Sequence, residues 1–389
     1  MEKVFSIENY TDKQKSLGLR NDENLERIVK MGVDLTEAYA SRNYSEMAKV
    51  AHFDLKSAND DEYSIFNKAF ELELFRYVFA NPTLELTSET RKSFRRKNPL
   101  KVGESERYYD VISAVLTTVT PAVTSLFTGM YSEIRNVGYG DTPEFDVESN
   151  EIFQVNVSAE GVAYGGEQAK HTYTKTVNTK DLNITFSTDW YRVAAGKEDF
   201  GKNFFRAAQG FASYFTVEAY NKLYAMAQQI PAAYKFTGIT TENIDLATMA
   251  VEGANGGAQA TILGTLPALR EALPSNDFLK VGVSAEYVKM GYVGEHAGTP
   301  LVKIANLVNP VTVNSNTAAG SPAFMFYNNV LFVMPFVGAK PVKVVFEGDL
   351  FNITRTAVET DDKTERASLT YKAGVDFVYS SIMALITAQ

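Results

Sequence analysis

The order of the elements predicted along the chain indicates an α+β protein. Two polar, β-prone runs at residues 152–158 and 171–191 are followed at once by one very long helix, then by a mixed segment, and a strand pair closes the chain. The first two runs are joined through the glycine-rich residues 161–166, so this ribbon has little core of its own. Because a two-stranded ribbon alone is marginal in water, we expect another copy of the same chain to cover it.

The long helix is predicted over residues 199–230 and ends at Pro231. Apolar residues recur at steps of three and four, which traces one continuous face over about 30 residues, or ~45 Å of helix. Gly210 and Ser213 lie inside it and lower its intrinsic helicity, so it depends on packing along that face. The predicted buried face consists of Phe204, Ala208, Phe211, Phe215, Ala219, Leu223, Ala227 and Ile230.

Residues 1–100 are predicted to form short helices. One apolar stripe (Tyr63, Phe66, Phe70, Leu74 and Tyr77) indicates a helix with cap residues Asn59 and Asp60 before it, ended by Asn81-Pro82. Residues 90–101 hold six basic side chains and no acidic one, with a break at Pro99. We therefore expect a linker and a domain boundary there.

Residues 109–134 are expected to form helical turns interrupted at Pro121, followed by a turn at 137–143. Further on, the pattern favours helices at 262–273 and 286–292, a buried strand at 278–283, and a hairpin of 324–327 with 330–333. The tail is expected to contain strands at 342–347 and 351–359, a polar turn at 360–364, and a strongly apolar strand within 367–386. In the second ribbon strand, Leu182, Ile184, Phe186 and Thr188 alternate with polar residues, as for one buried face.

Composition excludes several classes of protein. The 389 residues, 45% of them apolar, are enough for two or three domains with a real core. The net charge of -9 argues against a protein devoted to gripping nucleic acid, which needs a basic surface. Without cysteine, disulfides and thiolate chemistry are excluded. The N-terminus lacks an apolar signal core, and no uncharged apolar run is long enough to span a membrane.

No catalytic or metal site is predicted, and no cofactor. His52, His171 and His296 are scattered, each without the nearby ligands that zinc needs. The acidic residues from Asp146 lack the glycine and the glutamate of a calcium loop. The basic run at 91–101 could touch nucleic acid, but a solvated linker, or a surface for an acidic partner, fits better. Asp361, Asp362 and Glu365 beside Arg355 and Arg366 are interpreted as surface ion pairs that suit contacts between subunits.

In its order of elements, the sequence from about residue 105 resembles the major capsid proteins of tailed bacteriophages with the Hong Kong 97 fold. The resemblance implies a peripheral and an axial domain, an extended ribbon loop, a long spine helix and an N-terminal helical, scaffold-like segment. The ranges it implies are 1–104 for that segment, 105–143 for an N-terminal arm, 144–197 for the extended loop, 198–238 with 342–389 for the peripheral domain, and 239–341 for the axial domain.

The same resemblance implies a structural subunit, and no enzyme, that assembles through pentamers and hexamers into an icosahedral shell around a phage genome. Expected partners are many copies of itself, a portal, possible scaffold, decoration or protease proteins, and packaged double-stranded DNA bound without sequence specificity, but no membrane. The shell would assemble in the cytoplasm of the bacterial host. The candidate interface residues are Phe153, Tyr164, Lys170, His171, Tyr173, Lys175, Arg206, Arg355, Asp361, Asp362 and Arg366.

Three other functions stay open on the sequence alone. An encapsulin-like cargo shell would have the same fold, although such shells usually lack so large an N-terminal helical segment. A tail sheath subunit would form helical tubes in place of closed shells. An enzyme with a site built from dispersed residues would leave no motif in the sequence.

Overall fold

A computed structural model describes most of the chain from Glu23 onward. The described residues are 23–43, 60–91, 102–138, 140–141, 143–148, 172–189, 192, 195–272, 294–304, 306, 324–336, 340–355, 364–379 and 381–388. The predicted helix at 286–292, the strand at 278–283, the first ribbon run at 152–158 and the cap Asn59 lie outside these ranges. His52, His171 and residues 92–101 of the basic run also lie outside them.

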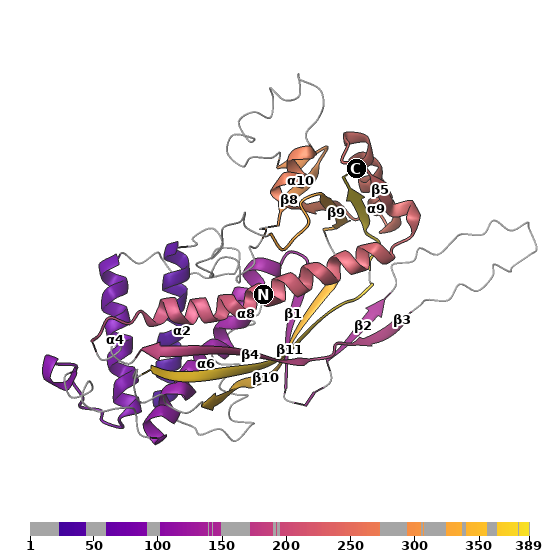
Figure 1. The fold of residues 1–389 in the computed structure, drawn as a ribbon. Helices are drawn as coiled ribbons and strands as arrows, with labels where there is room; N and C mark the ends of the chain where they lie inside the picture. Colours follow the sequence, from indigo (N-terminus) through magenta and orange to yellow (C-terminus); the bar gives the residue numbers. More distant parts are fainter. Residues whose placement is uncertain are drawn as a thin grey trace, which may run out of the picture.

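The fold is α+β, with one long helix lying across a four-stranded sheet and a second sheet near the far end of that helix (Figure 1). The helices are α2 (Glu23–Asn43), α4 (Asp60–Val78), α6 (Val102–Thr128), α8 (Phe200–Gln229), α9 (Thr241–Ala254) and α10 (Leu266–Glu271), with a short 3-10 turn η1 (Ala232–Tyr234). The strands are β1 (Ser132–Val137), β2 (Glu144–Glu148), β3 (Thr172–Thr176), β4 (Lys180–Asp189), β5 (Lys235–Thr237), β6 (Ala260–Gly264), β7 (Glu295–His296), β8 (Thr299–Lys303), β9 (Val330–Pro335), β10 (Val342–Arg355), β11 (Thr364–Phe377) and β12 (Ala384–Thr387).

The long helix α8 confirms the prediction almost to the residue. Asp199 caps its first turn by accepting a hydrogen bond from the Lys202 amide, and the chain leaves the helix at Ile230, before Pro231. Every residue of the predicted apolar face is buried. That face packs on the sheet below it: the rings of Phe215 and Phe346 lie 4.8 Å apart, and those of Phe211 and Tyr371 6.1 Å apart.

The four-stranded sheet, in the order β1-β10-β11-β4, corrects the predicted ribbon. The run at 171–191 is two strands: β3 pairs with β2, whereas β4 pairs along its whole length with β11. Leu182 and Ile184 on β4 do face the core, as predicted. The predicted strands at 342–347 and 351–359 are one strand, β10, with a register shift between Glu347 and Asn352 that bends it.

The six-stranded sheet, in the order β5-β12-β9-β6-β8-β7, contains strands from outside the expected range 239–341. Its strands β5 and β12 come from the two segments assigned to the peripheral domain. The predicted helix at 262–273 is wrong in its first part, because the wholly buried strand β6 occupies residues 260–264. The predicted hairpin at 324–333 is also wrong: β9 pairs with β6 and β12, while Asn306 holds the backbone of Phe326.

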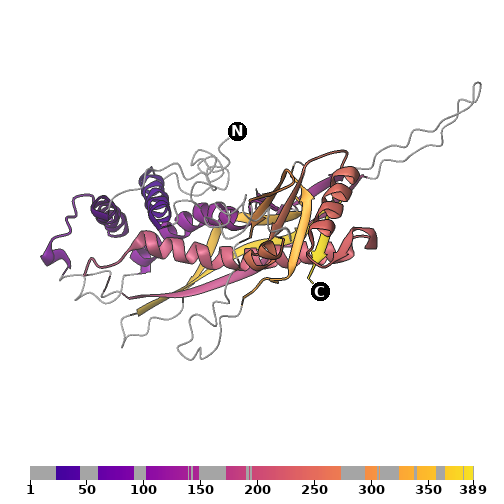
Figure 2. The same cartoon turned by 90° about the horizontal axis from the view of Figure 1, so that it is seen from above.

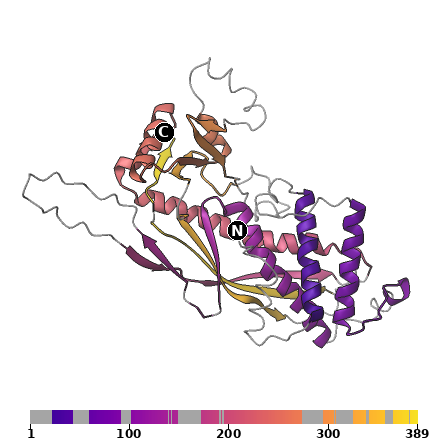
Figure 3. The same cartoon turned by 180° about the vertical axis from the view of Figure 1, so that it is seen from behind.

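At the other end of α8, the helices α2, α4 and α6 form one core with it (Figures 2 and 3). The helix with the stripe from Tyr63 to Tyr77 is confirmed as α4. The expected interruption at Pro121 is wrong, since α6 continues through it. On either side of the proline, the buried hydroxyls of Thr117 and Thr124 each donate to the carbonyl four residues earlier in the helix. The first part of the expected N-terminal arm is therefore one helix, most of whose described side chains from Tyr108 onward are buried, and the expected boundary after residue 104 falls inside this helix.

By length and apolar content alone, α6 resembles a membrane-spanning helix. Its segment Arg107–Thr128 has a mean hydropathy of 1.6, and 72% of that window is buried inside the protein. Core helices of soluble proteins share these properties. Among the described residues no other helix meets this criterion.

Candidate assembly interface

The strand pair β2/β3 joins the body of the subunit through a small apolar cluster of its own. Glu144 lies opposite Thr176 and Glu148 opposite Thr172. Against the pair, buried side chains from four segments pack together, and we call this cluster with the two strands the ribbon base. Its buried members are Phe145, Val147, Val177, Val345 and Val378.

Two cations lie close to the ring of Phe145, the largest side chain of the buried cluster. The guanidinium carbon of Arg135 lies 4.3 Å from the centre of the ring, and the ammonium of Lys343 lies 5.3 Å from it. Glu133 pairs with both cations. Burial alone would raise the pKa of Glu133, but the hydrogen bond from Lys343 and the charge of Arg135 outweigh it, so this pKa lies below its ordinary value.

Glu347 is a buried carboxylate that ties three segments together. Its side chain is 4% exposed and accepts hydrogen bonds from the Lys372 ammonium at 2.6 Å, from the backbone amide of Gly140 at 3.1 Å and from the hydroxyl of Thr179. Burial by itself raises the pKa of Glu347, yet these three donors outweigh it and the net pKa is lowered. The carboxylate, which lies on β10, therefore fixes the turn before β2 and the connection from β3 to β4 onto the paired strands β10 and β11.

Asp376 on β11 makes the third charged link, and it reaches the ribbon directly. Lys175 of β3 and Lys222 of α8 each lie 3.2 Å from its carboxylate. Lys175 also donates to the carbonyl of Phe377 at 2.5 Å and lies 4.2 Å from the centre of that ring. Burial raises the pKa of Asp376, but the amide of Phe377 and the two ammonium groups lower it more, so the net pKa is lowered.

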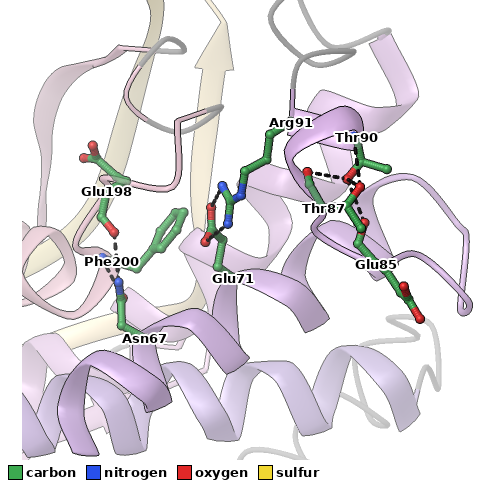
Figure 4. Close-up of polar contacts among 8 residues, drawn as sticks. All are labelled: Asn67, Glu71, Glu85, Thr87, Thr90, Arg91, Glu198 and Phe200. Atoms are coloured by element: carbon green, nitrogen blue, oxygen red, sulfur yellow. Dashed lines mark hydrogen bonds and ion pairs between the residues drawn. The ribbon is translucent and has the colours of Figure 1, made fainter. Parts of the chain in front are cut away.

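Hydrogen bonds from α4 hold the segment 195–200, which lies between β4 and α8. We call this segment the junction. The side-chain amide of Asn67 donates to the Glu198 carbonyl at 2.9 Å and accepts from the Phe200 amide at 3.1 Å (Figure 4). Close by, Arg91 makes a two-pronged pair with Glu71 at 2.9 and 2.8 Å. The Arg91 end of the basic run is therefore bound to α4, which corrects its interpretation as solvated linker.

The structure describes only some of the candidate interface residues predicted from sequence. Tyr173 is 48% exposed on β3, Lys175 belongs to the ribbon base, and Arg206 is exposed on α8. Arg355 and Arg366 lie on the paired strands β10 and β11, whose side chains at these positions are not among those described. Outside the described residues lie Phe153, Tyr164, Lys170, His171, Asp361 and Asp362.

The sequence reasoning missed the residues that carry the polar contacts. Asp376 is the only charge in the apolar run 373–379, and Glu347 directly follows the apolar residues 344–346. Both were usable signals, because a charge beside buried strand residues needs a partner. Nothing near Asn67 or Glu71 in sequence indicated their partners. His296 hydrogen-bonds Asp245 at 2.8 Å, and among the described residues no three acidic or histidine side chains gather as metal ligands do.

Comparison with known families decides the class of the protein. The model of one family, described as "SPbeta prophage-derived putative capsid protein YonB", matches residues 23–387. The chain belongs to this family of phage capsid proteins. It is a structural, shell-forming subunit of a virion capsid, and among the functions that the sequence left open the match favours the phage capsid over a cargo shell or a tail sheath. No curated protein matches the chain.

Three solved structures that are similar to this YonB-family chain come from capsids or heads. The mature capsid of bacteriophage PhiM1 is 13% identical with a TM-score of 0.44, and the match covers 68% of this chain and 87% of that one. The head of Helicobacter pylori bacteriophage KHP40 is 10% identical with a TM-score of 0.43, covering 67% and 88%. The capsid of an empty GTA particle is 11% identical with a TM-score of 0.42, covering 68% and 90%.

Proposed function

We propose that this capsid subunit assembles through pentamers and hexamers into an icosahedral shell around packaged double-stranded DNA, and that the ribbon base anchors an arm used between subunits. In this proposal residues 149–171, between β2 and β3, lie on a neighbouring copy. Tyr173 and Arg206, with Phe153, Tyr164, Lys170, His171, Arg355, Asp361, Asp362 and Arg366, contribute to contacts between copies, and Lys175 holds the arm.

The construction of the ribbon base is the observation that carries this proposal. A two-stranded pair is marginal alone, yet here Phe145, Glu347 and Asp376 each bind it to the main sheet. A strand pair fastened so firmly at one end is suited to carry a mechanical load from the segment between its strands. In a shell that load is the contact with the next subunit.

The packaged DNA and the other virion proteins that we propose as partners follow from the role as a shell subunit. We propose that the shell encloses a genome of double-stranded DNA with no sequence-specific contacts; the net charge of -9 is consistent with a container that does not grip that DNA tightly. A portal, and scaffold, decoration or protease proteins, are proposed as further partners, and the host cytoplasm as the place of assembly. We propose the domain ranges that the resemblance implies, with two changes. Strands β5 and β12 pass from the peripheral to the axial domain, and the end of the N-terminal segment moves from residue 104 to a position before Val102.

One deletion tests the arm directly. Because Glu148 lies opposite Thr172, an Asn-Gly turn can replace residues 149–171 and keep the pairing of β2 with β3. We expect a folded subunit, with the circular dichroism and melting temperature of the full chain, that forms no closed shells in negative-stain micrographs. The matched control removes residues 1–22, which precede the region shared with the family, and should still form shells. Normal shells from the first variant would overturn the role of the arm.

A further inference from the structure

The N-terminal helices are built into the apolar core of the subunit. We call residues 23–43 and 60–91 the N-terminal layer. Phe70 of α4 is fully buried, and its ring meets those of Phe200 and Phe204 edge-on, 5.6 and 5.8 Å away. From α2, Tyr39 packs against Phe205 at 5.7 Å. The first turns of α8 are thus covered by this layer, and its removal would expose aromatic rings.

The backbones of the layer and the body approach more closely than ordinary side chains allow. A Cβ atom on Gly32 of α2 would lie 2.6 Å from a methyl group of Val115 on α6. A Cβ on Gly201 of α8 would lie 2.6 Å from the Tyr63 hydroxyl and 3.0 Å from the Leu35 carbonyl. The two distances of 2.6 Å are shorter than real Cβ atoms show, so a side chain at either glycine would force a neighbour on the other side of the interface to shift. Such fit is typical of one core.

The layer also completes the start of α8. The first amides of a helix have no partner inside it, and here Asn67 accepts from the Phe200 amide while it donates to the Glu198 carbonyl. The Tyr63 hydroxyl donates to the capping carboxylate of Asp199 at 2.5 Å. Burial, together with this bond to Asp199, raises the pKa of Tyr63, so the hydroxyl remains a donor. The helix cap therefore depends on side chains from α4.

The ion pair of Arg91 with Glu71 lies against the junction itself (Figure 4). The Glu71 side chain is 3% exposed and that of Arg91 21%. Gly196 has a positive φ of 66°, and a Cβ there would lie 2.5 Å from the guanidinium. A side chain at Gly196 would therefore be strained by the backbone and would displace Arg91. A capped turn positions the arginine, whose amide donates to the Thr87 carbonyl at 3.0 Å.

We propose that the N-terminal layer is a permanent part of the shell subunit that positions the junction between strand β4 and the long helix α8. The layer then stays in the assembled particle, and any proteolytic processing of this chain is confined to residues before Glu23. The inference rests on the capsid role of the family and is independent of the arm proposed above. It also assigns residues 23–91 of the expected scaffold-like segment 1–104 to the mature subunit.

The mass of the shell subunit tests the retention of the layer. Purified, mature, DNA-filled particles are denatured, and the intact mass and N-terminal peptides of the subunit are measured. We expect a subunit that begins at or before Glu23 and contains residues 23–91. A subunit that begins after Arg91 overturns the inference, and so does a fragment of residues 23–91 that is cut from the chain and lost from the particle.

A pair of variants on α4 tests the positioning role. Asn67→Ala removes both bonds to the junction, whereas Ser64→Ala changes an exposed side chain on the same helix. We expect hydrogen exchange at the amides of residues 200–202 to rise on the order of tenfold in Asn67→Ala, as one lost hydrogen bond predicts, and to stay unchanged in Ser64→Ala. Equal exchange in the two variants overturns the role of Asn67, even where shells form normally.

Discussion

The N-terminal layer and the ribbon base are both fastened to the same helix and sheet, but by different forces. The layer shares one continuous apolar core with α6 and α8. The ribbon base has a separate cluster of five buried residues. It is also held by three carboxylates, each paired with a lysine: Glu133, Glu347 and Asp376. The first attachment is largely hydrophobic, and the second is largely electrostatic.

This difference predicts how each attachment responds to conditions. Burial of apolar surface is insensitive to pH and is strengthened by salts such as sulfate. A carboxylate whose pKa is lowered by its partners loses stabilising free energy once it is protonated. The subunit therefore has one side that stays attached under all conditions that keep it folded, and one side whose attachment weakens with acid. The following experiments sharpen or break that contrast, from the largest expected effect to the smallest.

Truncating the centre of the layer should be the most damaging change. Phe70→Ala removes a fully buried ring, and we expect the free energy of unfolding to fall by about 3–5 kcal/mol. Ile65→Ala, on the same helix but 67% exposed, should cost less than about 0.5 kcal/mol. Denaturant unfolding of the subunit measures both. Similar losses in the two variants would mean that the layer is not part of the cooperative core.

The matching truncation in the ribbon base should be smaller and local. Phe145→Ala empties a cluster of few residues, so we expect about 2 kcal/mol, below the usual range for a core phenylalanine. Hydrogen exchange should rise in β2 and β3 while α8 stays protected. If α8 loses protection to the same extent, the ribbon base is continuous with the main core and the contrast between the two attachments fails.

Acid should loosen the ribbon base alone. The pKa values of Glu347 and Asp376 lie below their ordinary 4.5 and 3.8 in the folded protein. Their contribution is therefore complete above the ordinary values and is lost as pH falls through the lowered ones. We expect about 1–2 kcal/mol less stability of β2 and β3 at pH 3 than at pH 7, read from hydrogen exchange corrected for its intrinsic pH dependence.

A neutral variant separates this effect from general acid unfolding. Glu347→Gln cannot be protonated in this range, so its ribbon base should be weaker at pH 7 and should change less on acidification. An unchanged pH response in that variant would assign the acid effect to other groups.

What the sequence could predict depended on how local the signal was. The limits of α8 followed from its own repeat, from Asp199 and from Pro231, all within one element. The pairing of β4 could not be predicted in this way, because its partner β11 lies almost two hundred residues further on and both runs alternate equally well. The helix α9 was missed although Ile244, Ala247 and Val251 recur at helical steps after the cap Thr240.

Pro121 and Asn67 mark the limit of local reasoning. Proline interrupts a helix in water, but α6 is enclosed by α2, α4 and α8, and packing outweighs the lost hydrogen bond. Asn67 looks like any polar residue on an exposed helical face until α4 is docked against the junction. The role of Asn67 depends on contacts with residues more than a hundred positions away, and the tolerance of Pro121 depends on the burial of the whole helix. No local pattern encodes either.

The smallest expected effect comes from the two lysines on Asp376. Lys222→Ala removes one partly exposed ion pair and should cost less than about 0.5 kcal/mol. Lys175→Ala also removes the bond to the Phe377 carbonyl and the contact with its ring, so about 1 kcal/mol is expected. A double-mutant cycle followed by hydrogen exchange in β3 compares them. A larger loss of free energy for Lys222→Ala would mean that the ribbon is held chiefly through α8. The stability of its attachment would then depend on α8, and so on the N-terminal layer that covers this helix.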